Sequence, residues 1–372
     1  MKCKEYQAKA VFRKYDIPVP QSVLVSSPGE LASAFESIGF PSVLKAQVLT
    51  GGRGKAGGIK IVESPEEGIT QGEKLLKSEI KGLKVKQVLL EEKINVAREY
   101  YVGIITDRDA YCPMAIVSSR GGMDVEEVSK TYPDKISKKH VDFLYGLQEY
   151  DARDLAYSCG IAKEDINSVV QIITKLYALY KGCDAELTEI NPLVVSTDGL
   201  IMAADGRLNI DDMALYRQPE LAAYKEVENE KEAAIKYIDV GGNVGIISSG
   251  AGMTMTVMDQ VAAVGGKPAN FLDGGLGLLS NASKIGLEIF AERGVDSILF
   301  STYTGGRSDV MAQKFVEAIE SMPELNIPII VRFQGLNQEE AEKIVSNCTY
   351  DNIHIAHGID ESAKMAVKLA RR

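Results

Sequence analysis

The sequence predicts an α/β fold divided into two domains, residues 1–230 and 231–372. A chain of 372 residues is longer than one hydrophobic core usually serves, which indicates more than one domain. Residues 218–238 form a polar, helix-prone stretch without a cluster of turn residues. Beyond it, strands, glycine-rich turns and helices alternate, which is typical of a doubly wound parallel sheet.

The first domain mixes helices and strands from its start. An amphipathic helix is expected at residues 4–15, with Tyr6, Ala10, Val11 and Phe12 on one side. Further helical patterns lie at residues 27–39, near 65–79 and within 151–182. Apolar or alternating runs predict the strands QSVLVSS, PSVLKAQV, IKIVES, QVLLEEKI, REYYVGIITDR and CPMAIVSS. The runs ELTEINPLVVST and LIMAADGRLNI are expected to form a hairpin around Asp198 and Gly199.

The second domain contains five strand-and-turn units. They are VGIISSGAGM, PANFLDGG, DSILFSTYTGGRSD, IPIIVRFQG and NIHIA. Ligands of such sheets bind beyond the carboxyl ends of the strands, and the glycine-rich turns of these units fall there. We therefore expect a binding site among those turns.

Composition and charge exclude several classes of protein. The net charge of −10 argues against general nucleic-acid binding, and no apolar run is long enough for a transmembrane helix. The start lacks the apolar core of a signal peptide, and five cysteines without close spacing indicate reduced thiols, so a cytoplasmic protein is expected. Residues 1–60 nevertheless carry a net charge of +5. This suits either a local site for a small polyanion or a solvated surface.

The stretch LKAQVLTGGRGKAGG, residues 44–58, combines a strand lysine with a glycine-rich loop. Lys45 lies on the strand, and glycines including Gly52 and Gly54 let backbone N–H groups approach an anion closely. Arg53 adds charge. The stretch lacks the GxxxxGK[ST] pattern of a Walker A loop. We interpret it as a phosphate site, with a flexible surface hairpin as the alternative.

Acidic and amide side chains stand at two further places. Glu91, the backbone near Ile94, and Glu99 suit the hydroxyls or base of a nucleotide, although an acidic pair such as Glu91-Glu92 is usually solvated. Glu189, Asn191 and Asp205 lie on the expected hairpin. Their oxygens are hard ligands that suit Mg²⁺ carried by a nucleotide. The alternative for Asp205 is a salt bridge to Arg207.

The stretch TYTGGRSD, residues 302–309, joins an expected strand to an expected helix. A helix N-terminus offers free N–H groups and a partial positive charge, which favours anions. Arg307 adds a multi-donor cation suited to a carboxylate, phosphate or sulfonate. The alternative is that Ser308 only caps the helix and Arg307 points to solvent.

Several blocks in this order resemble one family. EYQAKAVFRKY, KAQVLTGGRGKAGG, EINPLVV and ADGRL resemble the ATP-grasp domain of the β subunits of succinyl-CoA synthetases, which are NDP-forming acid–CoA ligases. NVGIISSGAGMTMTVMD and GGKPANFLD resemble the flavodoxin-like ligase domain of the same family. The resemblance covers essentially the whole chain. It implies a fold of an ATP-grasp domain followed by a flavodoxin-like parallel-sheet domain.

The resemblance also implies a mechanism. Mg²⁺-bound ATP, or GTP, and a small acid give an acyl phosphate; a histidine takes the phosphoryl group and CoA the acyl group, reversibly. By similarity Lys45, Gly52, Arg53 and Gly54 hold phosphates, and Glu91, Ile94 and Glu99 hold the nucleoside. Asn191 and Asp205 ligate Mg²⁺, and Glu189 lies near the visiting phosphohistidine.

The family's histidine and CoA site belong to an α-type partner subunit. The three histidines of this chain do not open glycine-rich helix starts, so a partner is expected, in an αβ or α₂β₂ assembly. The substrate contacts that the resemblance implies are Ser249, Gly305, Gly306, Arg307 and Ser308.

The acid site departs from the family pattern at three places. Ser249 replaces an asparagine, Arg307 replaces an apolar residue, and the run NFLDGGLGLLS around Gly274, Gly275 and Gly277 also differs. The acid is therefore succinate or a different small anion, such as a hydroxy- or sulfo-acid. The alternatives are an ATP-grasp carboxylate–amine ligase, which leaves the second domain without a role, or a non-catalytic nucleotide-binding regulatory subunit. An NAD site at GAGMTM lacks the third glycine of its pattern.

Overall fold

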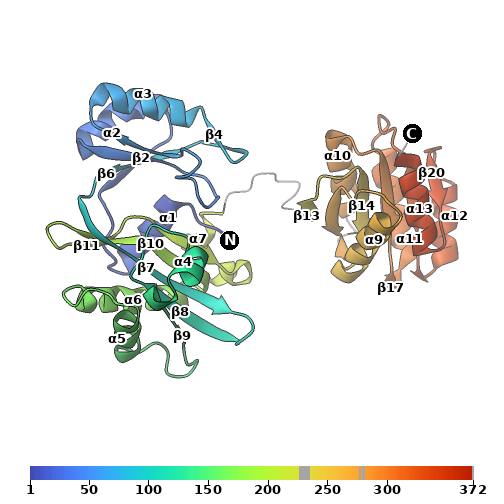
Figure 1. Cartoon of the computed structure of the whole chain (residues 1–372). Helices are drawn as coiled ribbons and strands as arrows, with labels where there is room; N and C mark the ends of the chain where they lie inside the picture. The colour runs from blue at the N-terminus through green and yellow to red at the C-terminus, as the bar shows by residue number, and fades with distance from the viewer. Residues whose placement is uncertain (226–234, 276–277, 279–280, 371–372) are drawn as a thin grey trace. The chain divides into compact units, whose positions relative to one another are not determined.

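The computed structural model describes residues 1–225, 235–275, 278 and 281–370 (Figure 1). Contacts divide the chain into two compact units, Met1–Lys225 and Glu226–Arg372. The predicted boundary between residues 230 and 231 lies in 226–234, outside the described residues. In the described part of the chain, no helix is both long and apolar enough to cross a membrane.

The first unit contains a small antiparallel sheet covered by two helices (Figure 1). Its strand order is β1-β6-β2-β3, with β1 (Ser22–Val25), β2 (Ser42–Ala46), β3 (Ile59–Val62) and β6 (Val88–Glu92). Helices α2 (Leu31–Ile38) and α3 (Pro65–Leu76) pack on it and on each other. A Cβ atom at Gly68 of α3 would lie 2.5 Å from the Phe35 ring, so this close helix contact requires glycine.

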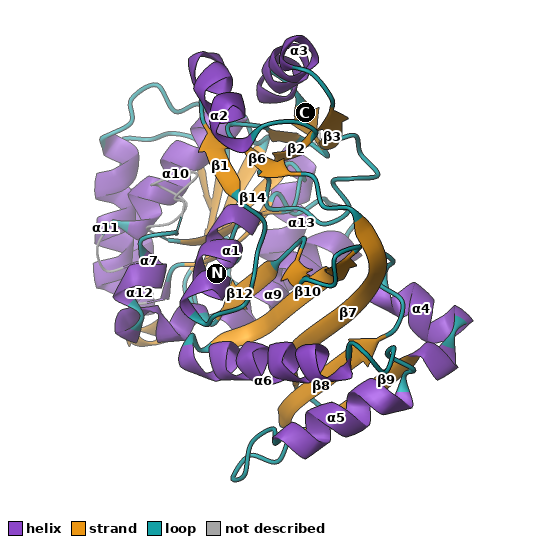
Figure 2. Ribbon diagram, turned by 90° about the vertical axis from the view of Figure 1, so that its left-hand side faces the viewer, coloured by secondary structure: helices purple, strands orange, loops and turns teal. Residues whose placement is uncertain are grey.

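A larger sheet forms the rest of the first unit. Its order is β11-β10-β7-β8-β9, and β12 also pairs with β10. The strands are β7 (Val96–Asp107), β8 (Cys112–Ser118), β9 (Ile136–His140), β10 (Ala185–Ser196), β11 (Ile201–Ala203) and β12 (Arg207–Ile210). Helices α5 (Glu149–Ser158) and α6 (Ile166–Gly182) lie side by side on one face (Figure 2). Helix α1 (Glu5–Lys14) contacts β12 and α6.

The first unit also contains several shorter elements. They are η1 (Pro28–Glu30), β4 (Glu79–Ile80), β5 (Leu83–Lys84), α4 (Val125–Thr131), η2 (Pro133–Lys135), η3 (Asp212–Arg217) and α7 (Pro219–Ala222).

The second unit is built on a sheet of order β13-β15-β14-β16-β18-β20. Its strands are β13 (Lys236–Asp239), β14 (Val244–Ser248), β15 (Asn270–Asp273), β16 (Ser297–Ser301), β18 (Ile329–Arg332) and β20 (Ile353–Ile355). Among the described strands of this sheet, only β13 is antiparallel to its neighbour. Numbered along the chain, the parallel strands follow the flavodoxin-like order 2-1-3-4-5. The predicted fold class is confirmed.

Helices cover both faces of this sheet. Apolar side chains on one face pack with α9 (Ala251–Ala263) and α13 (Ile359–Ala370). Those on the other face pack with α10 (Ala282–Arg293), α11 (Ser308–Glu320) and α12 (Gln338–Ser346). The β14 and β16 strands lie side by side although their helices cover different faces, so the turns after them form the point where the strand order reverses.

Several details differ from the sequence-based expectation. Strand β13 occupies the end of the stretch 218–238, which was expected to be helix-prone, and β9 was not expected. The run at 200–210 is two strands, because Ala204, Asp205 and Gly206 interrupt it. The segment expected as a turn before α11 contains a short strand, β17 (Thr304–Arg307), which pairs with β19 (Gly335–Leu336). The buried face of α1 includes the charged residues Glu5 and Lys9.

Candidate nucleotide and acid sites

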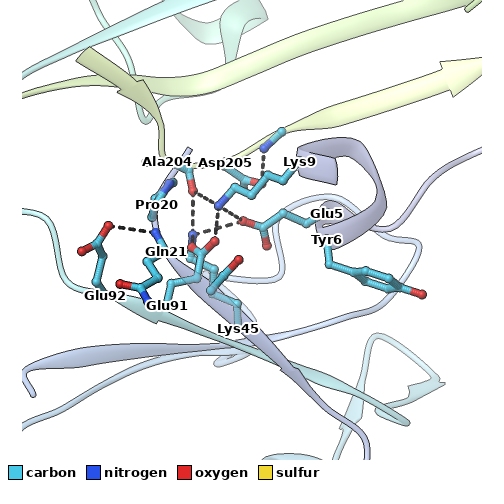
Figure 3. A network of polar contacts seen from close by, with 12 residues as sticks. Glu5, Tyr6, Lys9, Pro20, Gln21, Lys45, Glu91, Glu92, Ala204 and Asp205 are labelled. Atoms are coloured by element: carbon cyan, nitrogen blue, oxygen red, sulfur yellow. Dashed lines mark hydrogen bonds and ion pairs between the residues drawn. The ribbon is translucent and has the colours of Figure 1, made fainter. Parts of the chain in front are cut away.

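Lys45 lies near the end of β2 with its ammonium enclosed by oxygens. Its Nζ is 2.5 Å from Glu91, 3.1 Å from Glu5, and 2.6 Å from the Ala204 carbonyl oxygen (Figure 3). Burial alone would lower the pKa of Lys45, but the two carboxylates outweigh it and raise the pKa. Lys45 is therefore a permanently charged donor held at the junction of the two sheets.

Arg53 stands in the glycine-rich loop between β2 and β3 and folds back toward the same place. It contacts the Glu5 carboxylate, lies 3.0 Å from Asp205, and donates to the Ala46 carbonyl oxygen at 3.3 Å. It is only 8% exposed, so the expected flexible surface hairpin does not describe this side chain. The loop depends on glycine at Gly52, whose φ is 68°, a left-handed value that strains other residues.

Glu5 and Lys9 were not singled out from the sequence, yet they complete this cluster. Both belong to α1 and are 4% and 0% exposed. Lys9 Nζ is 2.8 Å from Glu5 and 2.5 Å from Glu91. Burial alone would raise the pKa of Glu5, but Lys45, Lys9 and Arg53 outweigh it and hold that pKa well below its ordinary value. The sequence contains a Glu–Lys pair at i and i+4, but this spacing is also typical of exposed helix faces, so it did not single out these residues.

The predicted nucleoside contacts are spread over β6 and β7. Glu91 is 1% exposed within the cluster, so the suggestion that this acid is simply solvated is wrong. Ile94 lies just after β6 and is half-buried. Glu99 is an exposed residue of β7 whose carboxylate adjoins Gly122. The structure therefore brings Glu91 to the lysines and leaves Glu99 accessible.

Asp205 lies in the interruption between β11 and β12. Its carboxylate pairs with Arg53, and the alternative ion pair with Arg207 is not formed, because Arg207 faces Glu189 at 4.0 Å. The pKa of Asp205 is raised by burial and by the nearby Glu5 carboxylate, although Arg53 opposes this. The Asp205 side chain remains 36% exposed, so it is still accessible to a ligand.

Asn191 lies on β10 beside the Asp205 turn. The Ala204 N–H donates to the Pro192 carbonyl oxygen at 3.1 Å, which joins the two segments. The Asn191 amide is fixed by the loop before α4: its Oδ1 accepts from the Gly122 N–H and its Nδ2 donates to the Met123 carbonyl, both at 2.8 Å. This orientation presents a carbonyl oxygen with a second lone pair.

These two residues fit a nucleotide-borne Mg²⁺. Within the described ranges, no group of three or more His, Cys, Asp or Glu residues is arranged to hold a metal. A closed protein cage is thus absent from that part of the chain. Mg²⁺ usually takes one or two protein oxygens and keeps waters and phosphate oxygens, and Asn191 with Asp205 supplies that number.

Glu189 sits two residues before Asn191 in a half-buried position. Tyr101 donates its hydroxyl to the carboxylate at 3.3 Å, and Arg207 lies on the other side. Burial raises the pKa of Glu189, and Arg207 and Tyr101 only partly oppose the shift. Glu189 is therefore a carboxylate whose charge is poorly compensated.

In the second unit, Ser249 lies at the point where the strand order reverses. Its hydroxyl donates to the Tyr303 carbonyl at 3.1 Å and accepts from the Tyr303 N–H at 3.2 Å. The turn after β14 and the turn after β16 are thereby joined. Gly250 and Gly275 both donate N–H bonds to the Asp273 carboxylate, which adds the turn after β15. Gly277 lies outside the described residues.

Gly305, Gly306 and Arg307 lie on β17, directly before α11. Arg307 pairs with Asp309 through Nε at 3.1 Å and through Nη2, and the Arg307 side chain is 62% exposed. It therefore has a partner and still offers donors to solvent. The capping alternative for Ser308 is not realised, because Arg307 holds the N-cap position. The Ser308 hydroxyl is buried without a hydrogen-bond partner among the described residues.

Arg332 at the end of β18 was also missed from the sequence. It is 3% exposed, its Nε has no hydrogen-bond partner in the described part of the chain, and burial lowers its pKa. Among the described residues no carboxylate pairs with Arg332, whose guanidinium contacts Ser301 and Gln334 instead. Arg332 lies close to the turn after β16, since it pairs in register with Ser301.

The two units define a protein that joins an ATP-grasp domain to a CoA-ligase domain. Residues 2–195 match the ATP-grasp domain family, and residues 247–366 match the CoA-ligase family.

Comparison of the whole chain narrows this class. The chain is 41% identical to the succinate–CoA ligase [ADP-forming] subunit beta of Natronomonas pharaonis, over 100% of this chain and 99% of the relative. It is 40% identical to the corresponding subunit beta 1 of Archaeoglobus fulgidus, over the full length of both. The chain therefore belongs to the succinyl-CoA synthetase β-subunit family, which confirms the resemblance seen in the sequence.

One further relative bears on the choice between ATP and GTP, and one solved structure bears on the fold. The chain is 40% identical to the succinate–CoA ligase [GDP-forming] subunit beta of Thermus thermophilus over 93% of each. The structure resembles ATP citrate lyase from Methanothrix soehngenii with a TM-score of 0.78 and 20% identity, over 99% of this chain and 100% of that one. This second likeness shows the fold alone.

Proposed function

We propose that the chain is the β-type subunit of an ADP-forming acid–CoA ligase. The observation that carries the proposal is the convergence of Lys45, Arg53 and Asp205 from separate elements beside Asn191. Pre-set cations and two oxygen ligands at one place suit the triphosphate of a magnesium nucleotide. Family membership supports the same assignment.

The side chains then have distinct tasks. Lys45, Arg53 and the backbone at Gly52 and Gly54 bind phosphate oxygens, and Asn191 with Asp205 holds Mg²⁺. When bound, the metal neutralises charge on the phosphoryl oxygens. The Ile94 backbone and Glu99 are the proposed contacts of the nucleoside, whereas Glu91 is buried against Lys9 and Lys45 and would hold the phosphate-binding lysine instead. ATP is the proposed nucleotide. GTP is the alternative, because one of the relatives is named as a GDP-forming enzyme.

A partner subunit completes the reaction. We propose that the nucleotide phosphorylates a histidine of an α-type subunit and leaves as ADP, and that the acid then takes the phosphoryl group from this histidine to form an acyl phosphate. The thiol of CoA, bound mainly by that partner, attacks the acyl carbon and releases inorganic phosphate. Glu189 would face the visiting histidine, where its poorly compensated carboxylate favours a protonated imidazole ring. The names of the relatives, each a subunit beta, support a partner, in an αβ or α₂β₂ assembly.

The acid is proposed to bind at the turns of the second unit. Ser249, Gly305, Gly306, Arg307 and Ser308 gather around the N-terminus of α11 and the reversal point. Nε and Nη2 of Arg307 hold Asp309, which leaves further N–H donors for a second anionic group of the substrate. The acid is succinate or a small hydroxy- or sulfo-substituted anion.

The proposal is tested by phosphoryl transfer in the purified pair of subunits. With γ-³²P ATP and Mg²⁺, we expect label on the histidine of the partner and CoA-dependent ADP release with one acid of a small-anion panel. Asp205→Asn should abolish labelling, whereas Asp198→Asn, in the exposed β10–β11 turn, should not. An absence of label with every nucleotide would refute the proposal. ADP release with an amine in place of CoA would instead favour a carboxylate–amine ligase.

A further inference from the structure

We infer that Lys9 is a positioning residue of the nucleotide site. Its positive charge keeps the carboxylates of Glu5 and Glu91 neutralised when the ammonium group of Lys45 binds a phosphate oxygen. This inference rests on the proposed nucleotide binding. Lys9 is among the largest fully buried side chains of the described residues and is 0% exposed. It does not contact the solvent and so does not bind the nucleotide itself.

Lys9 and Lys45 share the same three acceptors (Figure 3). Both ammonium groups contact Glu5 Oε1, Lys9 at 2.8 Å and Lys45 at 3.1 Å. Both also pair with the Glu91 carboxylate at 2.5 Å, Lys9 with Oε1 and Lys45 with Oε2. Both donate to the Ala204 carbonyl oxygen, at 2.7 and 2.6 Å. The two ammonium groups are therefore partners of the same two carboxylates and the same carbonyl group, although they contact different oxygens of Glu91.

The number of donors makes this sharing significant. An ammonium group has three N–H donors, and each lysine has three acceptors here. Lys45 can bind a phosphate oxygen only by releasing one of its acceptors. Only the Lys45 side chain, 11% exposed against 1% for Lys9, is open to a ligand. Lys9 keeps the released carboxylate or carbonyl paired, which avoids an unpaired buried charge.

The net charge of the cluster also indicates that Lys9 supports nucleotide binding. The cluster holds the cations Lys9, Lys45 and Arg53 and the carboxylates of Glu5, Glu91 and Asp205. Removing Lys9 leaves a net charge of −1 beside the phosphates, which opposes an anionic nucleotide. Removing the charge of Glu5 has the opposite electrostatic effect, but it also removes the carboxylate that Lys9, Lys45 and Arg53 share.

Substitutions of Lys9 and of Glu5 should therefore differ in their effects on MgATP affinity and on kcat. Lys9→Met should weaken MgATP binding by about tenfold or more, as expected for a lost charge at this range. Lys9→Arg, which retains the charge, should keep more affinity. Glu5→Gln should leave affinity equal or stronger and lower kcat by about tenfold, because Lys45 and Arg53 lose their common anchor. A purely structural role would not separate affinity from kcat in this way.

The experiment is calorimetric titration of the full chain with MgATP, followed by kcat with the partner subunit. Lys14→Met is the matched control, because Lys14 lies on the same helix in an exposed ion pair with Glu220. Circular dichroism establishes folding, and Lys9→Gln, which keeps N–H donors, replaces Lys9→Met if the latter is unfolded. Should wild type fail to bind MgATP, the proposed function fails. If wild type binds MgATP and the uncharged Lys9 variant that folds binds it equally well, the inference about Lys9 is overturned.

Discussion

Single residues in this chain show how buried charge is tolerated when partners are matched. The first unit buries Glu5, Lys9 and Glu91 almost completely, and each has at least two partners of opposite sign. Glu189 is different, because Arg207 is 4.0 Å away and Tyr101 offers one neutral hydrogen bond. A side chain kept in a poorly compensated state points to a task other than stability.

Glu189→Gln is expected to stabilise the free chain while it impairs phosphoryl transfer. Burial raises the pKa of Glu189 above its ordinary value of 4.5, so the folded state favours the proton and its stability falls as pH rises beyond that value. The variant should therefore melt at a higher temperature than wild type at pH 8. The difference should vanish toward pH 4, where the carboxyl is neutral in both states.

Thermal melts from pH 4 to 8 measure this difference. Glu186→Gln is the control, because Glu186 lies exposed on the same strand and pairs with Arg108 at the surface. A Glu189→Gln variant that is less stable than wild type at pH 8 would show that its carboxylate is well compensated after all.

Arg307→Ala is expected to raise the KM for the acid about tenfold or more, with little change in the KM for ATP. Hydrogen bonds to a charged group contribute roughly 1.5–3 kcal/mol, which corresponds to that loss. Lys314→Ala on α11, the helix that follows Arg307, is the control, since Lys314 pairs only with Glu317 in the described contacts. Equal effects on the KM values of both substrates would remove Arg307 from acid recognition.

The effect of this substitution should not depend on pH in the assay range. Arg307 holds the pKa of Asp309 at about 2, so both groups stay charged there.

At the scale of elements, the sequence predicted those strands whose own residues form a continuous or alternating apolar run. β2, β7, β10 and the five parallel strands of the second unit were all expected. The β17–β19 pair was not, because it joins residues about 30 apart through glycines that carry no apolar pattern. The cluster formed by Glu5, Lys9, Lys45, Arg53, Glu91 and Asp205 was missed for a related reason. An oppositely charged pair on a helix indicates an exposed face unless the strands that cover that face are known.

Gly52→Ala should weaken nucleotide binding through the conformation of the loop. The φ of Gly52 is 68°, which costs an L-residue roughly 1–2 kcal/mol, and a Cβ there would lie 3.2 Å from Lys81 Nζ. We expect the KM for ATP to rise about five- to thirtyfold. Gly51→Ala is the comparison, because its Cβ meets nothing within 4 Å and its φ is not in the left-handed range. Equal effects of the two substitutions would mean that the loop does not need this conformation when nucleotide is bound.

For the whole molecule, the division into two units separates the proposed chemistry as well as the cores. Lys45, Arg53, Asn191 and Asp205 all belong to Met1–Lys225, and the proposed acid contacts all belong to the second unit. The apolar clusters formed by the described residues are likewise confined to one unit each, two in the first unit and two in the second. Neither unit draws on the other for a core side chain in these clusters.

A chain of residues 1–225 alone should therefore fold and bind MgATP with a Kd within about threefold of the full chain. It should melt in a cooperative transition, because it retains both of its apolar clusters and all the cluster ion pairs. It should not support acid-dependent ADP release with the partner subunit. Asp205→Asn in the same short chain is the matched control, which should fold and lose binding. A short chain that folds but binds MgATP far more weakly than the full chain would show that the second unit contributes to the nucleotide site.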